Sequence, residues 1–81
     1  MHVLLVEDHE VNRFFVKSIL EEWDVKVDEA TSGSKAIEKA QNNKYDLILM
    51  DVQMPGMSGI EATKALREKL NIDAPIIALT A

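Results

Sequence analysis

Short apolar runs alternate with longer amphipathic segments along the chain. Residues 3–6, 47–50 and 76–79 are continuously apolar, which is typical of strands buried on both faces of a parallel sheet. Residues 25–29 instead alternate between apolar and polar side chains, which predicts a strand with one wet face at the edge of a sheet. The pattern therefore predicts four strands, and the second of them lies at an edge.

Three helices are predicted between these strands. The first begins at Glu10, and its inner face is predicted to consist of apolar and small residues at helical spacing, with the aromatic side chains in the core: Val11, Phe14, Phe15, Ser18, Ile19 and Trp23. The second occupies residues 32–41. The third starts with Ser58 and Glu61, which have the spacing of a capping box. Its predicted inner face is formed by Ile60, Thr63, Leu66 and Leu70.

The alternation of strands and helices favours one α/β domain that spans residues 1–81. Each connection is long enough for one helix, which favours a parallel sheet with right-handed crossovers. In a doubly wound sheet the first and third strands are internal and the second lies at an edge. The expected strand order is therefore 2-1-3-4.

Composition narrows the possible partners. The formal net charge of −5 disfavours nucleic acid and anionic membranes as partners of this segment. The sequence has no cysteine, which excludes disulfides and thiolate-bound zinc. No apolar run approaches the roughly 20 residues of a membrane helix, and the apolar residues begin directly after Met1 and His2, so no signal peptide is expected. We expect a cytoplasmic segment.

Three acidic residues follow two of the predicted internal strands. Glu7 and Asp8 come after the first strand, and Asp51 ends the third. Ligands of open parallel sheets bind beyond the carboxyl ends of the strands, where the strand order reverses. Each acid alone is better explained by solvation, but three together would repel one another unless they bind a cation or hold a proton. Mg²⁺ fits such a group and would allow a phosphate to approach it.

Longer motifs surround these acids. Asp51–Gly59 has the pattern Asp-x-x-Met-Pro-x-Met-x-Gly, and residues 79–81 are Leu-Thr-Ala. Together with the Glu-Asp pair, these motifs resemble the receiver domain of two-component response regulators, a domain with a flavodoxin-like fold. Residues 6–13 resemble in particular the receivers attached to hybrid sensor histidine kinases. The resemblance extends from residue 3 to residue 81.

The resemblance implies a role for each matching residue. Asp51 would be the phosphoacceptor, which receives a phosphoryl group from a partner histidine kinase or phosphotransfer protein in a phosphorelay. Thr80 would supply the switch hydroxyl, and the backbone amide of Ala81 would help to hold the phosphoryl oxygens. A receiver of this kind modifies its own aspartate and is not a turnover enzyme.

The resemblance also implies a magnesium site. Asp8 and Asp51 would be direct ligands, and Glu7 would be the second acid of the pair. Gln53 would contribute its backbone carbonyl. No other cofactor is implied.

The family fold continues with a further helix, strand and helix, including a lysine at the end of the fifth strand. No lysine of residues 1–81 matches that position, so we expect a partial receiver domain whose phosphorylation is impaired. The strand at residues 76–79 would have an open edge, which favours a homodimer or higher assembly.

Three alternatives compete with a working receiver. A haloacid-dehalogenase-type enzyme would need an acid two residues after Asp51, where Gln53 stands. A flavodoxin-like nucleotide binder would need a phosphate loop after the first strand, where the acidic residues would repel phosphate. A signalling-inactive fragment that self-associates remains open. Among the polar residues nearby, Asn12 is expected to serve the helix start, and His2 and His9 to be solvated.

Overall fold

The computed structural model describes residues 1–79. Strands and helices alternate along the chain in the order β1 (His2–Val6), α1 (Glu10–Glu22), β2 (Lys26–Ala30), α2 (Gly33–Asn42), β3 (Leu47–Asp51), α3 (Gly59–Glu68) and β4 (Ile76–Leu79). Across the described residues, no helix has both the length and the apolar character needed to span a membrane.

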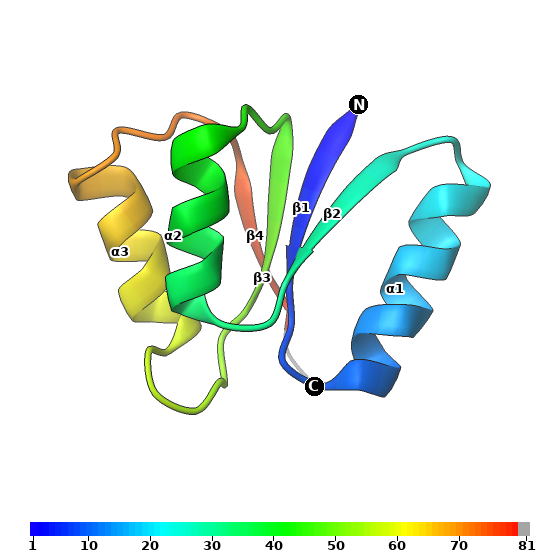
Figure 1. Ribbon diagram of the computed structural model, residues 1–81, viewed down its shortest axis with the longest axis horizontal. Helices are drawn as coiled ribbons and strands as arrows, with labels where there is room; N and C mark the ends of the chain where they lie inside the picture. The colour runs from blue at the N-terminus through cyan, green and yellow to red at the C-terminus, as the bar shows by residue number, and fades with distance from the viewer. Residues whose placement is uncertain (80–81) are drawn as a thin grey trace.

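The strands form one parallel sheet with the order β2-β1-β3-β4. This confirms the predicted order and places the alternating strand β2 at an edge. Helix α1 covers one face of the sheet, and α2 and α3 lie side by side on the other (Figure 1). The order reverses between β1 and β3, so their carboxyl ends border the point where ligands of such sheets bind.

Successive residues of the central strands face opposite layers. Leu4 and Ile48 pack with the small residues of α2 and α3, such as Ala36 and Ala62. Leu5, the next residue of β1, belongs to the core on the α1 side. The continuous apolar runs in β1 and β3 are therefore explained by burial on both faces.

The predicted inner face of α1 is wrong. No residue of α1 is buried, and Phe14 and Trp23 are both 71% exposed. The side chains that pack on the sheet are Val16 and Leu20. Apolar residues occur around most of the circumference of α1, so periodicity alone could not show which stripe faces the sheet.

The start of α3 is confirmed, whereas its predicted inner face is only partly right. The Ser58 hydroxyl accepts a hydrogen bond from the Glu61 amide at 3.2 Å, as an N-cap residue does. Leu66 is buried as predicted, but Ile60 points to solvent and Ala62 takes its place in the core. Gly59 and Ala62 are small because α3 lies close to the sheet.

Strand β4 is more exposed than its apolar sequence predicts. Among the described strands it pairs with β3 alone. Ile77 is 51% exposed and Ala78 is exposed as well. Within residues 1–79, β4 is therefore an edge strand and not the internal strand that its apolar sequence predicts.

A polar network lies near the beginning of β1. The Asp28 carboxylate accepts a hydrogen bond of 2.8 Å from the Tyr45 hydroxyl and lies 3.0 Å from Nε2 of His2. The hydrogen bond from Tyr45 lowers the pKa of Asp28, more than burial raises it. Burial and the same hydrogen bond raise the pKa of Tyr45. The expectation that His2 is solvated is thus wrong, because its ring contacts both Asp28 and Tyr45.

Candidate functional site

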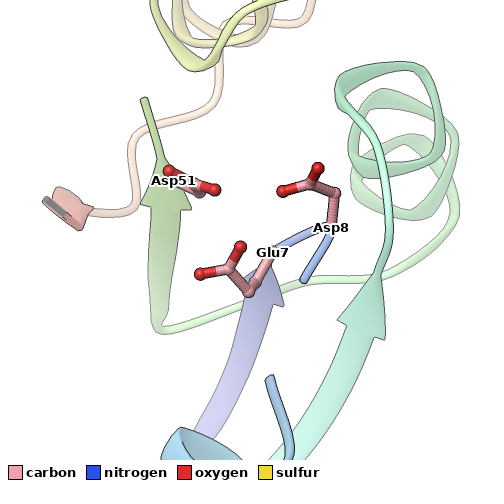
Figure 2. Close-up of side chains that lie close together, drawn as sticks. All are labelled: Glu7, Asp8 and Asp51. Atoms are coloured by element: carbon pink, nitrogen blue, oxygen red, sulfur yellow. The ribbon is translucent and has the colours of Figure 1, made fainter. Parts of the chain in front are cut away.

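Three carboxylates converge at the carboxyl ends of β1 and β3. Glu7, Asp8 and Asp51 each offer one oxygen, and these oxygens all lie within 4.8 Å of one another. Figure 2 shows the three side chains directed toward one shared space. The sequence placed these acids at the ends of two neighbouring strands, and the fold brings them together.

The carboxylates border an open cleft of about 470 Å³. Its walls come from the loop after β1, the first turns of α1, the end of β3 and the last residue of β4. The lining residues are Glu7, Asp8, His9, Asn12, Phe15, Val16, Asp51, Gln53 and Leu79. The cleft is large enough for a hydrated metal ion and a phosphoryl group.

Glu7 is the most enclosed of the three acids. It is 6% exposed, and the His9 amide donates a hydrogen bond of 3.1 Å to its Oε2. Burial raises the pKa of Glu7, and a hydrogen bond to Asp51 and the negative charge of Asp51 raise it further. A cation between the acids would offset this repulsion and favour the ionised form of Glu7.

Asp51 is the last residue of β3 and is half-buried. The backbone amide of Gln53 donates a hydrogen bond of 3.0 Å to Asp51 Oδ1. This hydrogen bond fixes the orientation of the Asp51 carboxylate. Asp8 is exposed in the loop between β1 and α1. The site therefore combines a buried acid, an oriented acid and an accessible acid.

Gly59 controls how closely α3 approaches Asp51. The Gly59 amide donates a hydrogen bond of 3.3 Å to the carbonyl oxygen of Val52. A Cβ atom at Gly59 would lie 2.7 Å from Val52 Cα and 2.8 Å from the Asp51 carbonyl carbon, and it would overlap the Asp51 carbonyl oxygen. From the sequence, this glycine is known only as the last residue of the Asp51–Gly59 motif. The structure shows that it is needed for contact with the strand end that carries Asp51.

Other residues proposed from the sequence differ in their placement. The Gln53 amide orients Asp51, and Gln53 lines the cleft, while the metal-ligand role of its carbonyl stays a prediction. Asn12 and His9 also line the cleft. Thr80 and Ala81 lie outside the described residues.

No residue pattern indicates a role for Arg13, which lies outside the stripe of the first helix that is predicted to face the sheet. In the structure the Arg13 guanidinium donates a hydrogen bond of 3.1 Å from Nη1 to the backbone carbonyl oxygen of Glu7. This contact joins two parts of the chain through the backbone, so no residue pattern could reveal it.

The donor atoms of the cluster suit a hard divalent cation. Mg²⁺ prefers oxygen ligands at about 2.0–2.1 Å and keeps several waters, so opposite ligands lie about 4 Å apart. Oxygens that all lie within 4.8 Å of one another fit such an ion with small side-chain adjustments. Glu7, Asp8 and Asp51 are thus a group that can hold Mg²⁺.

Comparison with protein families gives a match over almost the whole chain. The family described as "Response regulator receiver domain" matches residues 3–81. The chain is 44% identical over 81 residues to the autoinducer 2 sensor kinase/phosphatase LuxQ of Vibrio vulnificus strain YJ016, covering 100% of this chain and 10% of that protein. It is 43% identical over 81 residues to the sensor protein EvgS of Escherichia coli strain K12, covering 100% of this chain and 7% of EvgS. The chain thus spans a tenth or less of the length of these curated relatives.

Solved structures resemble the fold closely. The response regulator protein TrrA of Thermotoga maritima, in complex with Mg²⁺-BeF, superimposes with a TM-score of 0.92 at 39% identity, covering 99% of this chain and 69% of TrrA. The receiver domain of the sensor histidine kinase PA1611 of Pseudomonas aeruginosa PAO1, with a magnesium ion coordinated in its active site cleft, gives a TM-score of 0.92 at 37% identity. That match covers 99% of this chain and 66% of the other.

Proposed function

The chain belongs to the response regulator receiver domain family, and from this membership we propose that Asp51 accepts a phosphoryl group in a two-component phosphorelay. The observation that carries the proposal is the convergence of three carboxylates at the carboxyl ends of β1 and β3. The donor would be the phosphohistidine of a partner histidine kinase or phosphotransfer protein.

Asp51 suits the role of acceptor better than its two neighbours. One of its oxygens is held by the Gln53 amide, which leaves the other available for attack from the cleft. An Asp51 oxygen would form a bond to phosphorus while the phosphorus–nitrogen bond of phosphohistidine breaks, and the bonding electrons stay on the imidazole nitrogen. Glu7 is less suitable because it is only 6% exposed, which limits the access of a phosphoryl donor to its carboxylate.

Glu7, Asp8 and Asp51, with the backbone carbonyl of Gln53, would hold the Mg²⁺. When bound, the ion neutralises charge on the transferred phosphoryl oxygens and allows an anionic group to enter an acidic cleft. The protein contributes the fixed positions of the acids. Catalysis of transfer would therefore depend on positioning and electrostatics, with no separate general base from these residues.

The partner is proposed to be a histidine kinase. The neighbour TrrA is also known in a crystal structure of the histidine kinase ThkA in complex with TrrA, which supports a kinase as donor. Because the acceptor is a residue of the chain itself, we propose a phosphorylated signalling domain and not a turnover enzyme. We propose a cytoplasmic location, where ATP is available to a kinase. The net charge of −5 supports neither nucleic acid nor an anionic membrane as partner.

Calorimetric titration with Mg²⁺ and intact-mass analysis after incubation with acetyl phosphate test this proposal together. We expect Asp51→Asn to weaken Mg²⁺ binding by about tenfold or more, because a ligand charge is lost. Asp73→Asn, which removes the same charge from an exposed loop residue outside the cleft, is the matched control and should bind like the wild type. Equal Mg²⁺ affinity in all three proteins, or a phosphoryl adduct that forms equally well with EDTA present, would contradict the proposal.

A second proposal concerns the 81-residue chain by itself, which we expect to pair with another copy through the edge of β4 that faces away from β3. The observation in favour is the exposure of Ile77 and Ala78 on a strand that pairs with β3 alone among the described strands. Exposed strand edges are templates for pairing with other chains, most simply about a two-fold axis.

Sedimentation at micromolar concentration tests the pairing. Ile77→Lys should dissociate or unfold the assembly, whereas Val11→Lys, at an exposed apolar residue of α1, should leave it intact. A wild-type chain that is a stable, cooperatively unfolding monomer would refute the pairing. Dissociation by Val11→Lys alone would refute the assignment to β4 and place the contact on α1.

A further inference from the structure

We propose that Arg13 is a positioning residue that holds the loop between β1 and α1, so that the carboxylates of Glu7 and Asp8 face Asp51. The inference rests on the proposed Mg²⁺ site and adds a residue that does not itself touch the metal. Arg13 lies in the second turn of α1, with its side chain 18% exposed.

The Arg13 guanidinium joins three parts of the fold. Its Nε donates a hydrogen bond of 3.2 Å to Glu29 Oε1 on β2. Its Nη1 donates to the Glu7 carbonyl oxygen at 3.1 Å and makes a longer contact of 3.5 Å with the Asp8 carbonyl oxygen. Those two carbonyls belong to the residues that carry the acidic side chains, so the guanidinium fixes the backbone from which the carboxylates project.

Only a side chain with several donors in a fixed plane can do this. The guanidinium of arginine presents five N–H donors in a rigid fork. One side of the fork is held by Glu29, which is anchored on β2, and the other side meets the loop. A lysine ammonium is a single point charge on a flexible stem, so it could keep the ion pair with Glu29 or the loop contact, but not both with the same geometry.

Lys17 provides a matched comparison within the same helix. It lies one turn after Arg13, and its Nζ donates to the other oxygen of Glu29 at 3.1 Å. Among the described residues, Lys17 makes no hydrogen bond with the loop after β1. Lys17 therefore shares the helix, the charge and the partner of Arg13, and differs in the loop contact that the proposal needs.

The direction in which Mg²⁺ affinity changes when Arg13 is replaced distinguishes a positioning role from simple electrostatic repulsion. Arg13 brings a positive charge close to an acidic metal site. If its charge were all that mattered, its removal would tighten Mg²⁺ binding, because repulsion of the cation would fall. If it positions the loop, its removal weakens Mg²⁺ binding. Residues that orient metal ligands typically alter metal affinity by about 10- to 100-fold when mutated.

Mg²⁺ titration of the whole chain with Arg13→Gln and Lys17→Gln tests the inference, with urea unfolding of both variants measured in parallel. We expect Arg13→Gln to weaken Mg²⁺ binding about 10-fold and Lys17→Gln to leave it within about twofold of the wild type. Arg13→Lys is the second variant, in case Arg13→Gln does not fold. It should keep most of the stability and still bind Mg²⁺ more weakly than the wild type.

Amide chemical shifts measured without metal give an independent readout. Arg13→Gln should move the amide signals of residues 7–9, whereas Lys17→Gln should not. Equal Mg²⁺ affinities for the two glutamine variants, tighter binding by Arg13→Gln, or unmoved signals at residues 7–9 would overturn the inference while the proposed function stands. A wild-type chain that binds no Mg²⁺ would overturn the proposed function, and the amide shifts would still decide whether Arg13 holds the loop.

Discussion

Alanine at position 59 is expected to push α3 away from the strand end that carries Asp51. The added Cβ would lie 2.7 Å from Val52 Cα and 2.8 Å from the Asp51 carbonyl carbon, and ordinary contacts of a Cβ begin at 3.4 Å. The backbone would therefore have to separate by roughly 0.7 Å at Val52 and further at the Asp51 carbonyl oxygen. Both neighbours are main-chain atoms, so no side-chain rotation can relieve the contact.

The expected loss of stability is about 2–3 kcal/mol. Overpacking of a well-packed site costs about 1–3 kcal/mol and occasionally more. A backbone contact belongs at the upper end of that range, and the better helix propensity of alanine at the start of α3 offsets about 0.5–1 kcal/mol. In a domain of this size, each kcal/mol lowers the melting temperature by about 4–8 °C. Thermal unfolding followed by circular dichroism should therefore show a decrease of roughly 10–20 °C.

The other two glycines serve as controls for Gly59→Ala. A Cβ at Gly33 would meet the flexible side chain of Met57 at 3.0 Å and the Cβ of Ala62 at 3.2 Å, but no backbone atom among its three nearest neighbours. A Cβ at Gly56 would meet nothing within 4 Å. Gly56 has φ +76°, so alanine there costs about 1–2 kcal/mol in backbone strain but leaves the site in place. Only Gly59→Ala should also weaken Mg²⁺ binding, because Asp51 moves with the backbone. If Gly59→Ala and Gly33→Ala have the same melting temperature and the same Mg²⁺ affinity, the proposed effect of the close contact between α3 and the end of β3 is refuted.

Three further predictions concern single side chains. Tyr45→Phe should lower the free energy of unfolding by about 1–2 kcal/mol at pH 7, because a hydrogen bond to an ionised carboxylate is lost. The lowered pKa of Asp28 means that this stabilisation is complete above its usual value of 3.8 and disappears as the pH falls through the lower value of the folded state. The free energies of unfolding in urea of the two proteins should therefore converge as the pH is lowered below 3.8. Ser58→Ala should cost about 1 kcal/mol in urea unfolding, since the Glu61 amide loses its cap, and an unchanged midpoint would refute that role. Added Mg²⁺ should raise the thermal midpoint of the wild type more than that of Asp51→Asn, and an equal rise in both would place the ion elsewhere.

The fold could be predicted from local patterns, because each pattern reports on the surroundings of its own strand. The continuous apolar residues of Val3–Val6 indicate burial on two faces, and the alternation around Val27 indicates an edge. The convergence of Glu7 and Asp51 could also be predicted, because the carboxyl ends of neighbouring parallel strands lie at the same edge of the sheet.

Other features depend on distances between segments that are far apart in the sequence. The orientation of α1 was mistaken because Phe14 has the same spacing as residues that face the sheet. The roles of Gly59 and Arg13 could not be predicted from the sequence. The role of Gly59 depends on the short distance between α3 and the backbone at the end of β3, and that of Arg13 depends on its contacts with a loop carbonyl and with Glu29. The pairing of His2 with Asp28 likewise joins two strands that only the folded sheet brings together.

Chemical trapping tests most directly whether Asp51 accepts a phosphoryl group in a site that holds Mg²⁺. Borohydride reduces an aspartyl phosphate to homoserine, so the chain can be treated with acetyl phosphate, reduced and mapped by tandem mass spectrometry. Homoserine is expected at position 51, formed with Mg²⁺ and absent when EDTA replaces it. Conversion at Glu7 or Asp8 instead of Asp51, equal conversion without Mg²⁺, or no conversion after prolonged incubation would refute the role of Asp51 as a Mg²⁺-dependent phosphoacceptor.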